Sequence, residues 1–282
     1  MLILALDTTT RPGSAALWHR DRLVEVREGD PDRTHAERLP ADLVALLTTH
    51  AHTLADVDIF AVVSGPGGFT GLRVGIATIQ GLALVGHRPV FAASTLLLLA
   101  LAAKDKGIEA SAGQEGKGED TRGQHDSSEC FVGAWMHAAR REVFTALYKP
   151  VDEVQAPELA GLGAEDIIAA RVGLVTLDDA AVDAPEAVAA RWHARHPSAR
   201  LSVMGDAVSD FADPLRARFG NAVSLCSPPP LAGVLARLAA ALPDVTVSPH
   251  AIVPTYVRRP DAELARDRAL SRPRSDREWV GG

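Results

Sequence analysis

The alternation of apolar and polar positions divides the first part of the chain into short strands separated by helices. Leu2–Leu6, Ser14–Trp18 and Leu23–Arg27 are apolar runs joined by short polar turns, a pattern that predicts an antiparallel meander. Two further buried strands are predicted at Ile59–Val63 and Pro89–Ala92. Three meander strands followed by two helix-separated strands predict a mixed sheet with helices on its faces.

Three helices are predicted among these strands. Thr34–His50 begins with a T-x-x-E capping box that ends at Glu37, and Pro40 should kink this helix or mark the start of its regular part. Thr70–Val85 is apolar on nearly every face, and Ser94–Ala103 is apolar throughout. Because a helix that is hydrophobic on every face has to be covered on every face, we expect a second domain or a partner chain against Thr70–Val85.

Composition changes abruptly at residues 104–129. This stretch has no aromatic residue and is rich in Gly, Ser and charged residues, so it buries too little surface to offset its ordering entropy. We expect a disordered acidic insertion there. A pair of strands, Cys130–Met136 and Glu142–Tyr148, then resembles the start of a second copy of the first domain. The remaining predicted helices and strand are Glu165–Arg171, Glu186–His193, Leu201–Met204, Ser209–Phe219 and Leu231–Leu242.

The chain therefore reads as two domains of α/β class. The first is expected at residues 1–103 and the second at 130–258, with a flexible tail at 259–282. A chain of 282 residues is long enough for two packed cores.

Charge and cysteine content narrow the functional classes. A net charge of −7 argues against non-specific nucleic-acid binding by the chain alone, although it leaves room for a local basic patch. Cys130 and Cys226, the only cysteines, are expected to be core thiols in a reducing compartment. The start of the chain lacks the features of a signal peptide, and the longest apolar run, Phe91–Ala103, is shorter than the roughly 20 residues of a membrane span. We expect a soluble cytoplasmic protein.

The stretch Val62–Gly75, VVSGPGGFTGLRVG, joins a buried strand to a helix through glycines, as many phosphate-binding loops do. A P-loop needs Lys and Ser or Thr after its last glycine, but Gly71 is followed by Leu72 and Arg73. The dinucleotide fingerprint also fails, because Thr70 occupies the position of its third glycine. Two interpretations of this loop remain. Its amides at the start of the helix could bind an anion, or its glycines could allow the helix to pack closely against a neighbour.

Four stretches resemble the TsaB family: LALDTTTRPGSAALW, THAERLP, SGPGGFTGLRVGIATIQGLAL and PTYVRR. The resemblance is close over Leu2–Thr95 and weaker beyond. TsaB is the non-catalytic subunit of the bacterial machinery for tRNA threonylcarbamoyladenosine synthesis. The resemblance implies an actin-like, Hsp70-like ATPase superfamily fold, with two ribonuclease H-like lobes, mixed sheets and a cleft between the lobes.

In active members of that superfamily, the first strand and its turn form a phosphate-binding hairpin. The resemblance therefore implies that Asp7, Thr8 and Thr9 face a nucleotide. The alternative is that Asp7 caps its own turn through side-chain hydrogen bonds.

Catalytic chemistry is not expected. The family's catalytic paralogue, TsaD, carries a His-x-x-x-His metal pair where this chain has Ala93–Leu98, which contains no histidine, cysteine or acid. The pairs His50/His52 and His193/His196 are poorly spaced or sit at a helix end. We expect no metal, no other cofactor and no catalytic residue.

One hairpin departs from the family pattern. The usual D-A-R-x-G-E-like run is replaced here by His137–Glu142, HAARRE, with His137 in place of the Asp and Ala139 in place of an Arg. Any role of this hairpin toward a partner or ligand is therefore in doubt.

The resemblance implies a scaffold that binds TsaD, and with it the ATPase TsaE, to support threonylcarbamoyl transfer to N6 of the adenosine beside the tRNA anticodon. The tRNA would be reached through the complex, and the same face could form a homodimer in isolation. The alternatives are a stand-alone ATPase or kinase-like enzyme and a glycoprotease-like peptidase. The side chains expected at the partner interface are Leu39, Leu43, Leu46, Phe69, Thr70, Arg73, Ile76 and Gln80.

Overall fold

The first sheet contains the five strands expected from the apolar pattern. The computed structural model describes residues 1–112, 129–152 and 161–258. The strand order is β3-β2-β1-β4-β5, with β1–β3 antiparallel and β4 and β5 parallel to β1. The strands are β1 Leu2–Asp7, β2 Ser14–His19, β3 Arg22–Glu28, β4 Ile59–Val63 and β5 Val90–Ala93.

The second sheet repeats this topology. Its order is β10-β9-β6-β7-β8, with an antiparallel β6–β7–β8 meander and β9 and β10 parallel to β6. The repeat confirms two ribonuclease H-like lobes with mixed sheets. The strands are β6 Cys130–Ala138, β7 Glu142–Pro150, β8 Leu174–Asp183, β9 Arg200–Met204 and β10 Val223–Cys226.

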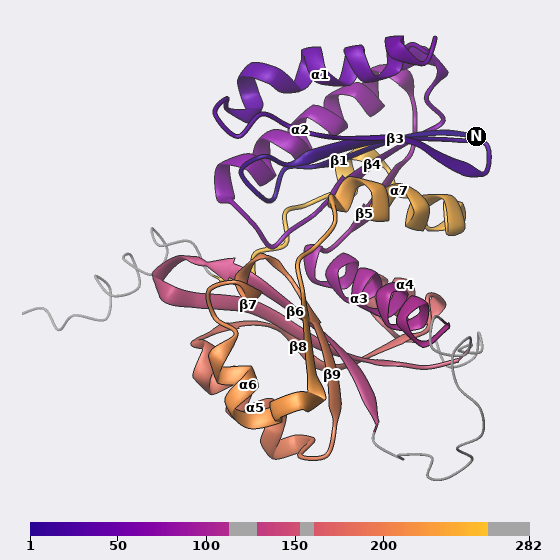
Figure 1. Ribbon diagram of the computed structural model, residues 1–282. Helices are drawn as coiled ribbons and strands as arrows, with labels where there is room; N and C mark the ends of the chain where they lie inside the picture. The colour runs from indigo at the N-terminus through magenta and orange to yellow at the C-terminus, as the bar shows by residue number, and fades with distance from the viewer. Residues whose placement is uncertain (113–128, 153–160, 259–282) are drawn as a thin grey trace, which may run out of the picture.

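Helices and sheets alternate in five layers (Figure 1). Helices α1 and α2 cover the outer face of the first sheet, and α5 and α6 cover the outer face of the second. Between the sheets lie α3, α4 and α7. The helices are α1 His35–Thr49, α2 Phe69–Gly86, α3 Thr95–Ala112, α4 Ala164–Arg171, α5 Pro185–Arg195, α6 Asp213–Phe219 and α7 Leu231–Ala241.

Two of the helices between the sheets, α3 and α7, are exchanged between the lobes. Helix α3 packs mainly on β6, β7 and β9, whereas α7 packs on the first sheet. Leu96–Leu99 are all buried in the core that the two lobes share, which explains why the start of α3 is apolar on every side. Domains divided at 103 and 130 therefore do not match the packing, because each segment supplies a helix to the other segment's sheet.

Most local predictions are confirmed. At the start of α1 the Glu37 carboxylate accepts hydrogen bonds from the Thr34 amide and hydroxyl, at 2.8 and 2.7 Å. The helix continues through Pro40. Strands β8 and β10 were not predicted. Both are edge strands whose side chains are largely half-buried or exposed, so their alternation of apolar and polar residues is weak.

Other expectations need correction. The helix expected at Ser209–Phe219 begins only at Asp213, after a short 3₁₀ turn at 206–208. Residues 104–112, expected in the disordered insertion, continue α3, while 113–128 and the tail at 259–282 lie outside the described residues. Cys130 is an exposed free thiol and Cys226 a half-buried one, so neither is the core thiol expected.

Helix α2 is the one helix of the described ranges that is long and apolar enough to cross a membrane, judged by length and composition alone. Length and apolar composition alone are weak evidence for a membrane span, since a core helix of a soluble protein can have both. The structure shows α2 lying on the first sheet, with Leu72, Ile76 and Ile79 buried against it.

Candidate functional site

Three of the stretches that resemble TsaB meet at one place, which we call the turn junction: the turn 8–13 after β1, His35 of α1 and the glycine-rich residues 67–75. A side chain at Gly71 would collide with the Thr8 carbonyl oxygen, and one at Gly67 would lie 2.5 Å from the Thr9 β-carbon. The Gly68 amide donates to the Thr9 carbonyl at 2.8 Å. The glycines therefore bring the start of α2 into contact with the turn, which is the packing alternative for this loop.

His35 is half-buried in the turn junction. Its Nε2 lies 3.1 Å from the Thr10 carbonyl oxygen and its Nδ1 2.9 Å from a guanidinium nitrogen of Arg38. Since a carbonyl accepts and a guanidinium donates, the ring is the neutral form that carries its proton on Nε2. Arg38 is itself buried and bonds Asp42 at 2.9 Å. This chain of bonds fixes α1 to the turn.

We predict that this histidine makes stability depend on pH. Burial, the largest cause, lowers the pKa of His35, and Arg38 lowers it further, against the raising effect of the Thr10 carbonyl. The folded state thus binds fewer protons than the unfolded state, so this contribution is complete above the unfolded pKa of 6.5 and is lost as the pH falls through the lower folded pKa.

The measurement is urea unfolding at a series of pH values between about 5 and 8, the range in which histidine titrates. The wild type should lose stability below pH 6.5, and His35→Gln should lose less over the same interval. Equal slopes for the two proteins would contradict the assignment.

A cleft of about 380 Å³ separates the lobes on one side of the molecule. Asp7, Glu28 and Asp206 line it together with Arg11 and the Pro228–Pro230 segment. Three carboxylates against one guanidinium complement a polyphosphate poorly. The residues of the cleft do not fit the nucleotide that the superfamily fold implies.

The three residues expected to face a nucleotide do not line one cavity. Asp7 lines the cleft, but one of its oxygens accepts the Thr9 amide at 2.9 Å and the Thr9 hydroxyl at 2.6 Å. Burial raises the pKa of this carboxyl. Thr8 and Thr9 line a different hollow, of about 390 Å³, between the first turns of α1 and α2. The bonds of Asp7 favour the turn-capping alternative.

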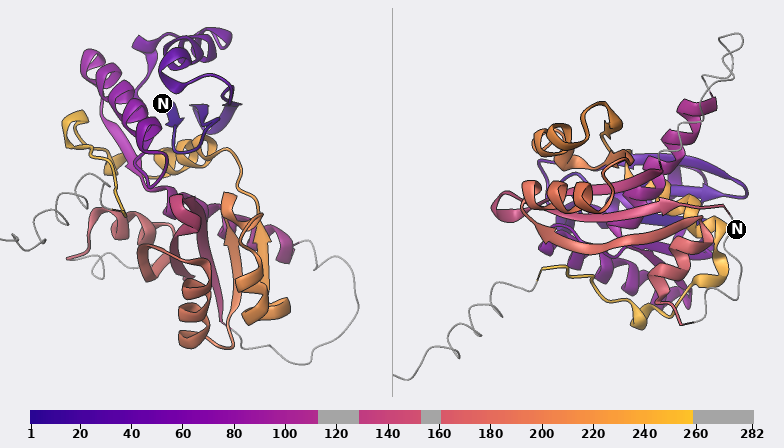
Figure 2. Two further views of the ribbon diagram at one scale, coloured as in Figure 1. Left: turned by 90° about the vertical axis from the view of Figure 1, so that its left-hand side faces the viewer. Right: turned by 90° about the horizontal axis from the view of Figure 1, so that it is seen from below.

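A segment after α7, residues 246–258, joins the two lobes, and we call it the strap (Figure 2, left). Val247 pairs with Val90 at the edge of the first sheet through bonds of 2.8 and 2.9 Å. The Gln80 side chain donates to the Pro249 and Ile252 carbonyls, at 2.9 and 3.0 Å. The strap is thus held along α2 before it reaches the second lobe.

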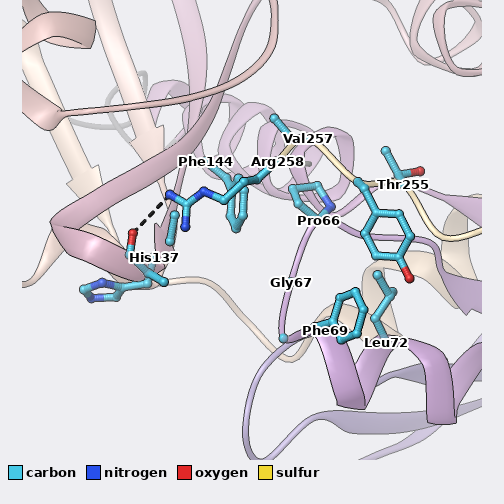
Figure 3. Close-up of a pocket in the computed structure, with 13 residues that line it drawn as sticks. Pro66, Gly67, Phe69, Leu72, His137, Phe144, Thr255, Val257 and Arg258 are labelled. Carbon is cyan, nitrogen blue, oxygen red and sulfur yellow. Dashed lines mark hydrogen bonds between the residues drawn. The ribbon is translucent and has the colours of Figure 1, made fainter. Parts of the chain in front are cut away.

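The end of the strap closes a second cavity between the lobes, of about 510 Å³, which we call the aromatic cavity (Figure 3). Arg73 donates to the Tyr256 hydroxyl at 2.8 Å, and the guanidinium of Arg258 bonds Glu142 and the Ala139 carbonyl. The glycine-rich loop, the β6–β7 hairpin and the strap each contribute to the wall. The lining includes Pro66, Phe69, Leu72, His137, Phe144, Tyr256 and Arg258.

Half of the predicted partner-interface residues are buried inside the first lobe. Leu39, Leu43, Leu46 and Ile76 are at most 4% exposed and belong to the core between the helices and the sheet. Their helical spacing signalled the inner face of α1 and α2, so their placement on a docking surface was wrong.

The other four predicted interface residues differ in their surroundings. Gln80 is half-buried and bonds the strap. Arg73 and Phe69 are exposed but lie against Tyr256, with the two aromatic rings 5.5 Å apart. Thr70 is exposed. Of the eight predicted interface residues, Phe69, Thr70 and Arg73 are therefore the exposed ones.

The histidine pairs have ordinary packing roles. His50 bonds Glu25 at 2.6 Å, and His193 and His196 lie edge-on to phenylalanine rings. Within residues 1–112, 129–152 and 161–258, no three His, Cys, Asp or Glu side chains are grouped so that they could hold a metal ion.

The family model described as "TsaD: tRNA N6-adenosine threonylcarbamoyltransferase" matches residues 30–113. The chain is 41% identical over 100 residues to the tRNA threonylcarbamoyladenosine biosynthesis protein TsaB of Escherichia coli, which covers 36% of this chain and 43% of that protein. It is 39% identical over 103 residues to the TsaB protein of Haemophilus influenzae, again over 36% and 43%. The aligned stretch thus spans less than half the length of these curated relatives.

The similarity in structure extends over both lobes. A crystal structure from Pseudomonas aeruginosa, described as an uncharacterized protein with similarity to peptidase YeaZ, is 27% identical and superimposes with a TM-score of 0.62. That match covers 91% of this chain and 99% of the other. YeaZ from the same organism gives 25% identity and a TM-score of 0.58, over 90% and 100%.

Proposed function

We propose that this chain, as a protein of the TsaB family, takes part in tRNA threonylcarbamoyladenosine biosynthesis as a non-catalytic subunit. In this role it binds a TsaD-type transferase, and with it the ATPase TsaE, in the cytoplasm. The complex transfers the threonylcarbamoyl group to N6 of the adenosine beside the anticodon. The observation that carries the proposal is the turn junction, at which three of the stretches that resemble TsaB pack against one another through the glycines of residues 67–75.

The outer surface of α1 and α2 supports a docking role in this first lobe. After the inward leucines are buried, apolar side chains still face outward, with Val44 49% and Val85 85% exposed. Small residues, Ala41, Ala77 and Gly81, are exposed among them. Small residues allow the backbone of a partner helix to approach closely. Burying an apolar patch against a partner removes it from water and so stabilises the complex.

The test is co-purification of the chain with the TsaD protein from the same organism. Val44→Asp and Ala77→Asp should each weaken the complex about tenfold or more, because each buries an unpaired carboxylate in the interface. Val175→Asp is the matched control, since Val175 is 41% exposed on β8 of the other lobe. An undiminished complex with both α1 and α2 variants would overturn this surface.

In isolation the same surface is proposed to form a symmetric homodimer. Light scattering at rising concentration should show mass approaching twice the monomer's for the wild type and not for Val44→Asp. A monomer at every concentration would remove the dimer from the proposal while leaving the complex with TsaD in place.

Absence of catalysis by the chain alone is also part of the proposal. The carboxylate-rich cleft complements a polyphosphate poorly. Turnover of ATP or of peptides by the purified chain, at rates that follow the protein through purification, would favour the kinase-like or peptidase alternatives instead.

A further inference from the structure

The aromatic cavity offers a ligand a mostly apolar surface (Figure 3). The rings of Phe69, Phe144 and Tyr256 line it, together with aliphatic side chains such as Leu72. The three rings come from the start of α2, from strand β7 and from the strap, so the cavity spans the junction of the two lobes. An occupant that matches this lining carries an aromatic or aliphatic side chain.

The basic side chains of the lining already have acidic partners. The guanidinium of Arg258 bonds the Glu142 carboxylate and the Ala139 carbonyl. The His137 imidazole lies 3.0 Å from a carboxylate oxygen of Asp210. Because both basic side chains are bound to acidic groups of the chain itself, the lining favours an apolar group over an anion.

Two of the rings are exposed while the cavity is open. Phe69 is 45% and Tyr256 39% exposed, and their ring centres lie 5.5 Å apart. The cavity of about 510 Å³ falls in the range of sites that bury small aromatic groups. Covering the two rings removes apolar surface from water, and this favours binding of an apolar occupant.

The described part of the chain ends in the wall of this cavity. Val257 and Arg258 are lining residues, and the next residue begins the segment 259–282, which lies outside the described residues. The segment therefore starts at the rim of the cavity. A flexible chain of about 20 residues has a root-mean-square span of about 25 Å, so a residue some 20 positions along can return to the cavity.

The sequence of this segment contains one group that matches the cavity. Trp279 is its single aromatic residue, and Val280 follows it. The other residues are largely charged or small, so the segment itself supplies little apolar surface to cover an indole. Elsewhere in the chain, Trp135 and Trp192 are fully buried. An indole has a large apolar surface, and the cavity at the start of the segment would remove it from water.

We propose that the aromatic cavity is a docking site for Trp279 of the chain's own 259–282 segment. The indole enters between the Phe69–Tyr256 pair and Phe144 and covers the exposed rings. The segment is favoured over a second copy or another protein because it is joined to the cavity rim, which gives Trp279 an effective concentration on the order of millimolar. This contact ties the segment across both lobes, and it does not depend on the proposed function.

The experiment titrates the full chain into a fluorescently labelled synthetic peptide of residues 270–282 and records the anisotropy. In Trp279→Ser the chain's own indole is missing, so the cavity is open to the peptide. In the wild type the linked indole competes for the cavity, and the peptide should bind about tenfold or more weakly than to Trp279→Ser. The same peptide with serine in place of its tryptophan should bind neither protein.

Variants of the cavity wall show where the peptide binds. Phe69→Ser and Tyr256→Ser, each combined with Trp279→Ser, remove one exposed ring and should weaken peptide binding about tenfold. Val175→Ser in the same background is the matched control, since Val175 is an apolar side chain that is 41% exposed on β8 and does not line the cavity. Its affinity should stay within about twofold, and urea unfolding checks that each variant is folded.

The proposal is overturned by a lack of saturable peptide binding to Trp279→Ser, by equal affinity of the peptide for Trp279→Ser and the wild type, or by equal losses in Phe69→Ser and Val175→Ser. If the indole came from a second copy, light scattering would show a dimer that Trp279→Ser abolishes and Val44→Asp does not. That result would also overturn the contact within one chain. None of these measurements involves TsaD, so their failure leaves the proposed function in place.

Discussion

Replacing Gly71 by alanine is expected to lower the free energy of unfolding by about 2–3 kcal/mol, the upper range for overpacking a tight contact. A β-carbon at this position would overlap the Thr8 carbonyl oxygen and lie 2.9 Å from a carbon of the His35 ring. Neither neighbour is the free end of a flexible side chain, so the start of α2 has to move away from the turn. The substitution should also weaken binding to TsaD, because α2 carries part of the proposed surface.

Gly81 provides a matched control in the same helix. Nothing lies within 4 Å of a β-carbon built there, so Gly81→Ala should be neutral or stabilise by up to about 1 kcal/mol through helix propensity. Urea unfolding of both variants at neutral pH is the measurement. Equal stability of the two variants would show that the glycine of the turn junction is not required for packing.

Replacing Asp178 by alanine is expected to cost about 3 kcal/mol, the scale for removing one member of a shielded charged network. From β8, its carboxylate accepts bonds from three residues of α5: Arg191 at 3.0 Å, the Trp192 indole at 2.9 Å and Arg195 at 2.8 Å. The Trp192 side chain is fully buried, so its N–H would lose its partner away from water.

Asp179 is the adjacent control, because it is exposed on the same strand. Asp179→Ala should stay within about 0.5 kcal/mol of the wild type, as surface substitutions usually do. Burial raises the pKa of Asp178, but its bonds to Trp192 and the arginines outweigh this and the pKa is lowered overall. Its contribution is therefore present above the unfolded pKa of 3.8 and is lost as the pH falls through the lower folded pKa.

Unfolding measured at acidic pH tests whether the charged bonds of Asp178 set the cost of the substitution. The stability difference between wild type and Asp178→Ala should be constant near neutral pH and shrink as the pH falls below 3.8. A difference that persists unchanged into acid would mean that packing, and not the charged bonds, sets the cost of the substitution.

Sequence reasoning was reliable where the interactions are local. The five strands of the first sheet, the capping box at Thr34 and Glu37 and the helix Leu231–Leu242 could be read from spacing, because each depends on residues within a few positions of one another. Edge strands β8 and β10 could not, since half of their side chains face water and the period-two signal is lost.

The candidate site divides in the same way. The glycine-rich loop could be excluded as a P-loop from its sequence, and the packing alternative that remained is the one the turn junction adopts. The interface leucines could not be placed from sequence, because helical periodicity reveals that a face is buried but not what buries it. The strap and the aromatic cavity could not be foreseen either, as they join Phe69, Phe144 and Tyr256 from three distant parts of the chain.

By itself, then, the sequence determined the strands of the first lobe, the suggestion that this lobe is repeated and the family that the motifs resemble, since these follow from local patterns of side chains. The tertiary structure decided which lobe each central helix covers, which leucines face inward and where arginines gather against aromatic rings. Those outcomes depend on contacts between residues far apart in the chain, and such contacts are selected by the packing of the whole molecule.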